Sequence, residues 1–281
     1  MNGKNLTVTF FIIICLGALA FSYFNWKQKL AGESEENAFA EGSVTEIAMM
    51  DRDTADSFEH ESYTIEEGAA LTASELASLS TNMDEALAGL LASRFDSGEH
   101  VKLLIVGSQA ITQGGEGGVA GILAGSLANV YHGFIETDIV SFTGTSREFI
   151  EKMDELVDWE TGYDAILLEP FTLNNNGRVV IEDEHRHILQ FRERVQEFTE
   201  DAVLVLMPSQ PIHRPNFYAT QIRALERFTE SREIPYIDHW QGWPNVMDEK
   251  LYDYLDENSA PTNLGAEVWA GVLREYFIGD Y

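Results

Sequence analysis

The fold of this chain follows from one stretch, Val101-Lys-Leu-Leu-Ile-Val-Gly-Ser-Gln-Ala110. Its first six residues are almost all apolar, which is typical of a strand buried on both faces of a parallel sheet. Gly107 and Ser108 follow at once, and an apolar helical pattern begins at Val119 after a loop with four glycines. A strand, a turn of small residues and a helix form the opening unit of an open α/β domain. Ligands of such domains bind beyond the carboxyl ends of the strands.

Four more short apolar runs come after that strand, and helical patterns separate all of them. The expected strands are Val101–Val106, Ile135–Phe142, Ala165–Leu168, Ala202–Met207 and Ile234–Ile237. The expected helices are Leu71–Phe95, Val119–Val130, Ser146–Val157, Glu184–Phe198, Phe217–Glu230 and Asn263–Phe277. Regular alternation of strands and helices predicts a three-layer α/β/α domain with a five-stranded parallel sheet.

The part of the chain ahead of this domain divides into two segments. Residues 6–24 are apolar apart from three hydroxyl residues and carry no charge. A helix of this length rises about 28 Å, close to the thickness of the hydrocarbon core of a bilayer. We therefore expect residues 1–30 to form a transmembrane anchor; the alternative is a cleaved signal peptide, because Ala18-Leu-Ala20 resembles a cleavage site. Residues 31–70 are acidic and non-periodic and predict a flexible linker, which leaves 71–281 for the domain and its leading helix.

Charge and cysteine content restrict the partners of the protein. The formal net charge is −29, which disfavours binding to nucleic acid, since such a surface must neutralise phosphates. Acidic residues also repel anions, so a neutral or cationic substrate is favoured. Cys15 is the only cysteine, and we expect neither a disulfide nor a cysteine metal site. Both interpretations of the N-terminal segment place the domain outside the cytoplasm, either at the cell membrane or secreted.

Polar residues follow each expected strand, and parallel strands bring all their carboxyl ends to one edge of the sheet. That edge should gather Ser108, Gly144, the segment 169–176, His213 and the pair Asp238-His239. A serine hydroxyl can attack an ester carbonyl when a histidine takes its proton. The oxyanion that forms needs preorganised donors, which the backbone N–H of Gly144 and the side-chain amide of Asn174 could supply. The sequence therefore predicts a site at this edge that is suited to acyl transfer.

Three blocks of this chain resemble those of the SGNH (GDSL-type) hydrolases over roughly residues 101–277. The blocks are Gly107-Ser108, then Gly144 and Asn174, then a Pro261-Thr-Asn-Leu-Gly265 segment that opens the last helix. The resemblance implies a flavodoxin-like fold and an esterase, lipase or carbohydrate O-acetyl hydrolase or transferase. It implies no metal and no organic cofactor. It also implies that Ser108 is the nucleophile and that Gly144 and Asn174 are the oxyanion donors.

The first block departs from the family pattern, which reads Gly-Asp-Ser. Counting from Gly107 places Ser108 in the aspartate position and Gln109 in the serine position. Alignment on the later Ile111-Thr-x-Gly114 segment instead places Ala110 in the serine position. Ser108 is the nearest serine, and it does not stand in register with the family's nucleophile.

The last block also departs, since Asp-x-x-His-Pro becomes Glu257-Asn-Ser-Ala-Pro261 with Ala260 in place of the histidine. His213 and His239 remain as candidates for the general base. Glu169, at the end of a buried strand beside Pro170, is a further site candidate by position. His185 and His187 lie in the acidic start of a helix, where we expect them to be solvated.

Two functions follow from these observations. The first is an extracytoplasmic SGNH-type hydrolase or acyl-transfer enzyme that acts on esters, such as the O-acetyl groups of cell-surface glycans. The second is a non-catalytic relative that binds a surface polysaccharide or assists cell-envelope assembly. The missing Asp-x-x-His pair favours the second function.

Overall fold

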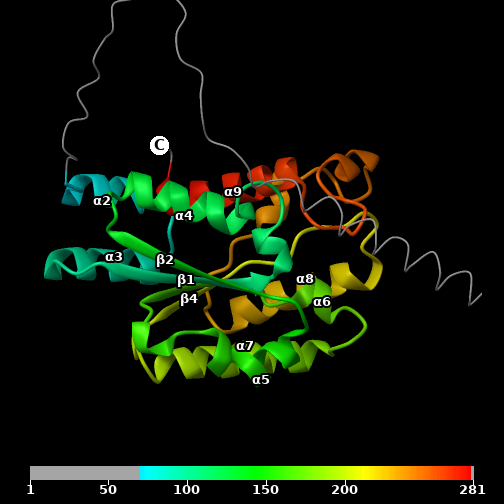
Figure 1. Cartoon of the computed structure of the whole chain (residues 1–281), viewed down its shortest axis with the longest axis horizontal. Coiled ribbons are helices and arrows are strands. Elements are labelled where there is room, and N and C mark those ends of the chain that lie inside the picture. Colours follow the sequence, from blue (N-terminus) through cyan, green and yellow to red (C-terminus); the bar gives the residue numbers. More distant parts are fainter. Residues whose placement is uncertain (1–69, 280–281) are drawn as a thin grey trace, which may run out of the picture. The chain divides into compact units, whose positions relative to one another are not determined.

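The computed structural model describes residues 70–279, which form an α/β domain (Figure 1). Strands β1 (Val101–Ser108), β2 (Ile135–Phe142), β3 (Ala165–Leu168) and β4 (Val203–Leu206) make one parallel sheet in the order β2-β1-β3-β4. In this register Val101 pairs with Ile135, and Leu103 pairs with Ala165. The predicted α/β class and parallel sheet are confirmed. The predicted anchor and linker lie outside the described residues.

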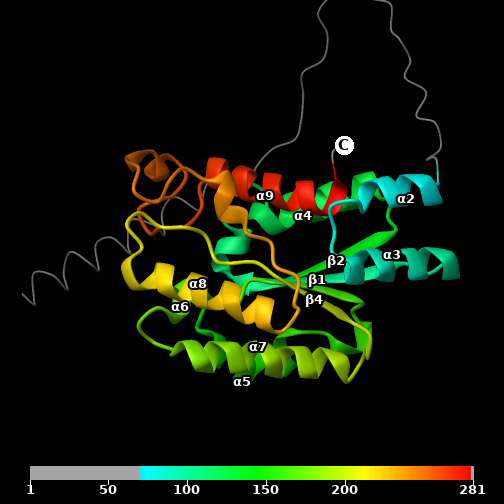
Figure 2. The same cartoon turned by 180° about the vertical axis from the view of Figure 1, so that it is seen from behind.

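Helices cover both faces of the sheet. Figures 1 and 2 show α2, α4 and α9 on one side of the strands and α5 and α7 on the other. The helices are α2 (Ala73–Leu79), α3 (Glu85–Ser97), α4 (Gly118–Val130), α5 (Ser146–Leu156), α6 (Thr172–Asn175), α7 (Ile181–Gln196), α8 (Asn216–Ser231) and α9 (Asn263–Ile278). Short 3-10 helices are η2 (Gln109–Thr112), η3 (Trp159–Thr161), η4 (His239–Gly242) and η5 (Glu249–Asp253). No helix within residues 70–279 is both long and apolar enough to cross a membrane.

Two hydrophobic cores lie on the two faces of β1. Leu103 and Ile105 pack into a core with side chains of α3, α4 and α9. Leu104 and Val106 point the other way, into a core with α5, α7 and α8. Burying an aliphatic side chain of this size contributes about 1.5–3 kcal/mol. The unbroken apolar run of β1 is therefore explained by burial on both faces.

The prediction of a fifth strand over Ile234–Ile237 is wrong. This segment forms only an isolated parallel bridge, between Tyr236 and Leu206 of β4. The bridge keeps two hydrogen bonds, from Leu206 N to Pro235 O and from Ile237 N to Leu206 O, both 2.8 Å long. Pro235 has no N–H to donate, and the side chain of Asp238 caps η4 immediately afterwards. Because Pro235 cannot donate a hydrogen bond and η4 begins just after Asp238, this segment cannot form the regular hydrogen bonds of a β-strand with β4.

The single leading helix predicted over Leu71–Phe95 is also wrong, because the structure has two helices there. The hydroxyl of Ser80 donates to Leu76 O at 2.7 Å, and that of Thr81 donates to Ser78 O at 2.8 Å. Such bonds satisfy the last carbonyls of α2 and favour ending the helix. Asp84 then takes an extended conformation, with φ −60° and ψ 150°, and begins α3.

The start of α9 offers a test of how closely the loops pack around the sheet. A Cβ at Gly265 would lie 2.2 Å from the carbonyl oxygen of Tyr254, whereas a Cβ at Gly271 on the same helix meets nothing within 4 Å. We expect Gly265→Ala to lower the free energy of unfolding by about 2–3 kcal/mol through overpacking. Gly271→Ala should raise it by up to about 1 kcal/mol through helix propensity. Urea denaturation of both variants measures the difference, and equal effects would contradict the packing described for α9.

Candidate functional site

Polar side chains gather where the four strands end, at the carboxyl edge of the sheet. β1 ends at Ser108, Gly144 follows β2, α6 follows β3, and the segment 207–215 follows β4. Since the strands are parallel, these segments meet at one edge, as the sequence predicts.

Glu169 is the buried centre of this edge, with no exposed surface. Its Oε2 accepts a hydrogen bond from Ser108 N at 2.6 Å, and its Oε1 accepts one from Phe171 N at 2.9 Å. The hydroxyl of Ser209 also donates to Oε1. One carboxylate thus joins the ends of β1, β3 and β4. Glu169 lies at the carboxyl edge, as the sequence predicts, and its role there is to hold the strand ends together.

Phe171 sits in a backbone conformation that bulky residues rarely adopt, with φ 64°. It is 1% exposed, and its N–H is held by Glu169. The strained turn is therefore fixed from both sides and starts α6, the short helix that carries Asn174. Strain of this kind persists where the surroundings determine it and is common at functional sites.

Ser108, the nearest serine to the family's nucleophile position, is 3% exposed. Its backbone N–H belongs to the Glu169 network, and its hydroxyl forms no hydrogen bond with a histidine ring in the described part of the chain. Gln109, the next residue, is exposed and begins η2. The solvent-facing position after β1 is therefore held by an amide and not by a hydroxyl.

Gly144 and Asn174, the two predicted oxyanion donors, lie in direct contact. The Nδ2 of Asn174 donates to the carbonyl oxygen of Gly144 at 2.7 Å. A Cβ at Gly144 would lie 2.5 Å from the ring of Phe142, so a larger residue there would displace that ring. The bond uses one of the two amide hydrogens of Asn174 and leaves the other as a donor. The structure thus brings together two residues that stand 30 positions apart.

His239 is not available as a general base. It is fully buried, its Nε2 lies 2.8 Å from Pro208 O, and its Nδ1 accepts from Trp243 Nε1 at 3.0 Å. The ring also stacks on Trp269. Burial lowers the pKa of His239 to about 3, so the ring stays neutral. With both nitrogens engaged, His239 is a structural residue, which corrects the sequence prediction.

His213 lies on the segment after β4, as predicted, and its Nδ1 is 2.8 Å from the hydroxyl of Tyr252. Its Nε2 is buried and has no partner within residues 70–279. Gln210, on the same segment and 4% exposed, donates to Ser259 O and leaves its own Oε1 without a partner there. The role of His213 as a base stays a prediction.

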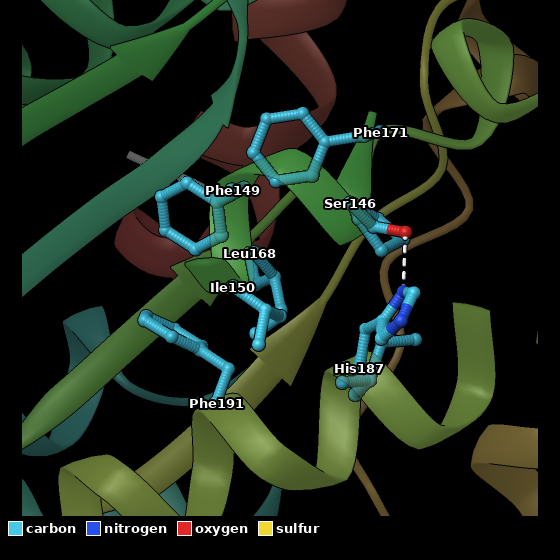
Figure 3. A pocket seen from close by; sticks show the side chains of 9 residues that line it. Ser146, Phe149, Ile150, Leu168, Phe171, His187 and Phe191 are labelled. Carbon is cyan, nitrogen blue, oxygen red and sulfur yellow. Dashed lines mark hydrogen bonds between the residues drawn. The ribbon is translucent and has the colours of Figure 1, made fainter. Parts of the chain in front are cut away.

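The structure also shows a buried cluster that the sequence prediction missed. Ser146, the first residue of α5, places its Oγ 2.8 Å from the Nδ1 of His187 on α7 (Figure 3). Asn175 accepts from Ser146 N at 2.9 Å and donates from its Nδ2 to Glu184 Oε2 at 2.7 Å. Thr172 donates its hydroxyl to the other oxygen of Glu184 at 2.8 Å. The cluster ties α5, α6 and α7 together beside Gly144 and Asn174.

The expectation that His185 and His187 are solvated is wrong. His187 is 7% exposed, and the ring of His185 stacks on that of Phe228 with centroids 4.2 Å apart. Burial lowers the pKa of both rings. The burial of His187 could have been predicted from the sequence, because residues at helical spacing form the buried face of α7. This face includes a glutamate and a histidine: Glu184, His187, Ile188, Phe191 and Val195.

No group of three or more His, Cys, Asp or Glu side chains lies close enough to hold a metal ion in the segment that the structure describes.

Comparison with known proteins finds similarity in structure only. No family model matches the chain, and no curated protein matches its sequence. Among solved structures, a lipase from a goat rumen metagenome superimposes with a TM-score of 0.50 at 13% identity, over 64% of this chain and 99% of the lipase. A lipolytic protein of the G-D-S-L family from Desulfitobacterium hafniense gives 0.51 at 15% identity, over 63% and 99%.

A third structure is a variant of an acetyl-xylooligosaccharide esterase from Geobacillus stearothermophilus. It gives a TM-score of 0.50 at 16% identity and covers 64% of this chain and 95% of the esterase. Identities this low establish the fold and not the activity. The resemblance drawn from the sequence is thus confirmed at the level of structure. The chain has the fold of the SGNH (GDSL-type) hydrolases and is strongly divergent from them in sequence.

Proposed function

We propose that this protein is an SGNH-type hydrolase or acyl-transfer enzyme that acts on esters at the carboxyl edge of its sheet. The observation that carries the proposal is the pairing of Gly144 with Asn174, whose second amide hydrogen remains free to donate. A preorganised donor at such an edge stabilises the oxyanion of an acyl-transfer reaction. The shared fold with a lipase and an acetyl-xylooligosaccharide esterase supports the same chemistry.

For the substrate we infer O-acetyl groups of cell-surface glycans. Acetylated sugars are uncharged at the ester, which suits a protein with a net charge of −29. For the location we infer the outside of the cytoplasmic membrane, because residues 6–24 form an uncharged apolar stretch of membrane-spanning length. Secretion after cleavage of this stretch is the alternative.

A second candidate function is binding of a surface polysaccharide, or assistance in cell-envelope assembly, without catalysis. The engaged ring of His239 and the 3% exposure of Ser108 favour it, since neither residue forms a nucleophile–base pair. Ala260 in the family's histidine position favours it as well.

Three consecutive asparagines allow a matched experiment on the first proposal. Asn174 bonds to Gly144, whereas Asn176 is exposed. With p-nitrophenyl acetate and acetylated xylooligosaccharides as substrates, we expect turnover by the full-length protein and a loss of about 100- to 1,000-fold in kcat for Asn174→Ala, the usual cost of removing an oxyanion donor. Asn176→Ala should keep the wild-type rate. A wild-type rate equal to buffer, together with saturable binding of the acetylated sugar, would instead establish the non-catalytic function.

A further inference from the structure

The only hydrogen bond between a serine hydroxyl and a histidine ring within residues 70–279 joins Ser146 to His187. Resting on the proposed ester chemistry, we propose that Ser146 is the nucleophile, that His187 is its general base, and that the small adjoining apolar pocket accepts the methyl group of an acetyl ester. The pair would replace the serine and histidine that the usual family positions lack.

The hydroxyl of Ser146 is held in a fixed place. Thr145 caps α5, and its N–H and hydroxyl both bond to Glu148, at 2.7 and 2.9 Å. Asn175 Oδ1 lies 2.9 Å from Ser146 N and 3.2 Å from Ser146 Oγ. Asn175 is in turn fixed by its bond to Glu184. Orientation of this kind is what a nucleophile and its base require.

His187 is suited to accept a proton. Burial lowers its pKa, so the ring is neutral near pH 7 and can take the proton of Ser146. Two cations, Arg186 and Arg147, also lower the pKa, while Asp183 and Glu151 oppose them. The pair therefore resembles in distance and protonation the activated serine of hydrolases.

An apolar pocket opens beside the pair (Figure 3). Its cavity volume is about 10 Å³. This is room for a group about the size of one water molecule. Apart from Ser146 and His187, its wall is made by hydrophobic side chains, which are Phe149, Ile150, Leu168, Pro170, Phe171, Ile188 and Phe191. This size and the apolar walls fit the methyl group of an acetyl ester and exclude longer acyl chains.

The reaction balances without a cofactor. Ser146 Oγ forms a bond to the acyl carbon while its proton passes to His187 Nδ1. The ester C–O bond then breaks, and the leaving alcohol takes that proton. Water adds to the acyl-serine and gives a proton to His187, which returns it to Ser146 as the carboxylic acid departs. Gly144 precedes Ser146 by two residues, and Asn174 donates to the carbonyl oxygen of Gly144. These two residues are the oxyanion donors of the proposed reaction.

Kinetics of full-length variants and a covalent probe test the pair. With p-nitrophenyl esters, Ser146→Ala and His187→Gln should lose at least about 100-fold in kcat/KM, and acetate should be turned over faster than octanoate. Ser126→Ala, whose hydroxyl bonds within α4 to Ile122 O, should match wild type. Circular dichroism checks that each variant is folded.

Phenylmethylsulfonyl fluoride provides a readout that needs no variant and no substrate. Peptide mapping of the treated wild-type protein should find the sulfonyl group on Ser146. Labelling of Ser108 with loss of activity in Ser108→Ala would overturn this inference and leave the proposed function standing. Labelling of Ser146 without ester turnover would support the pair and count against the proposed function. No label on Ser146 in an active enzyme would overturn the pair.

Discussion

Replacing Glu184 by glutamine is expected to raise the free energy of unfolding at pH 8 by about 3 kcal/mol and to leave it nearly unchanged near pH 4. Burial, with a smaller contribution from Glu169, raises the pKa of this carboxyl from its ordinary 4.5 to about 7 against the opposing hydrogen bonds from Asn175 and Thr172. Each unit of pKa difference between folded and unfolded states corresponds to about 1.4 kcal/mol.

The sign follows from which state holds the proton. Between pH 4.5 and 7 the unfolded chain loses the proton of Glu184 and the folded protein keeps it, so wild-type stability falls as the pH rises. Glutamine imitates the protonated carboxyl and removes this fall. Urea denaturation between pH 4 and 8 measures the difference. Glu182→Gln, an exposed change on the same helix, removes the same charge and is the control. Identical pH profiles for the two variants would contradict a buried, protonated Glu184.

Replacing His239 by glutamine is expected to destabilise the protein most at neutral pH, by about 2–4 kcal/mol, because it removes a buried ring stacked on Trp269 and two hydrogen bonds. The deficit should shrink on acidification. Since the pKa of His239 is lowered to about 3 in the fold, the unfolded wild-type chain gains the proton first as the pH falls from about 6.5. By about pH 3 wild type loses about 5 kcal/mol that the variant does not lose, so the deficit first closes and the variant then becomes the more stable protein.

The same denaturation series measures this effect, with His100→Gln as the control, since His100 is exposed. Glu184 and His239 change wild-type stability in opposite directions between about pH 4.5 and 6.5. The two contributions therefore partly cancel in the pH dependence of wild-type stability. The difference in free energy of unfolding between wild type and each variant separates them. A deficit for His239→Gln that stays constant with pH would contradict the neutral, fully engaged ring.

Much of the fold could be predicted because buried strands leave a strong local signal. The ends of β2 and β3 match the predicted Ile135–Phe142 and Ala165–Leu168. The errors lie where backbone chemistry overrides hydrophobic pattern. Pro235 removes a donor from the fifth strand, and the hydroxyls of Ser80 and Thr81 end a helix inside an apolar repeat.

The site was predictable in position and less so in its residues. Topology alone brings Gly144 and Asn174 to one edge, and the structure joins them. The contact between Ser146 and His187 depends on how α5 packs against α7, and no local pattern encodes such packing. The family pattern places the catalytic histidine after residue 256, so a comparison with that pattern does not select His187 in the middle of the domain. The buried stripe of α7 was the available clue.

In the proposed reaction an acyl group passes through a serine at the carboxyl edge of the sheet. The most direct measurement is peptide mapping of full-length protein that is quenched in acid during turnover of p-nitrophenyl acetate. We expect one acetyl group on Ser146 in wild type, and none on that residue in His187→Gln. Turnover without any acetyl-serine, or acetyl groups confined to surface lysines, would contradict it.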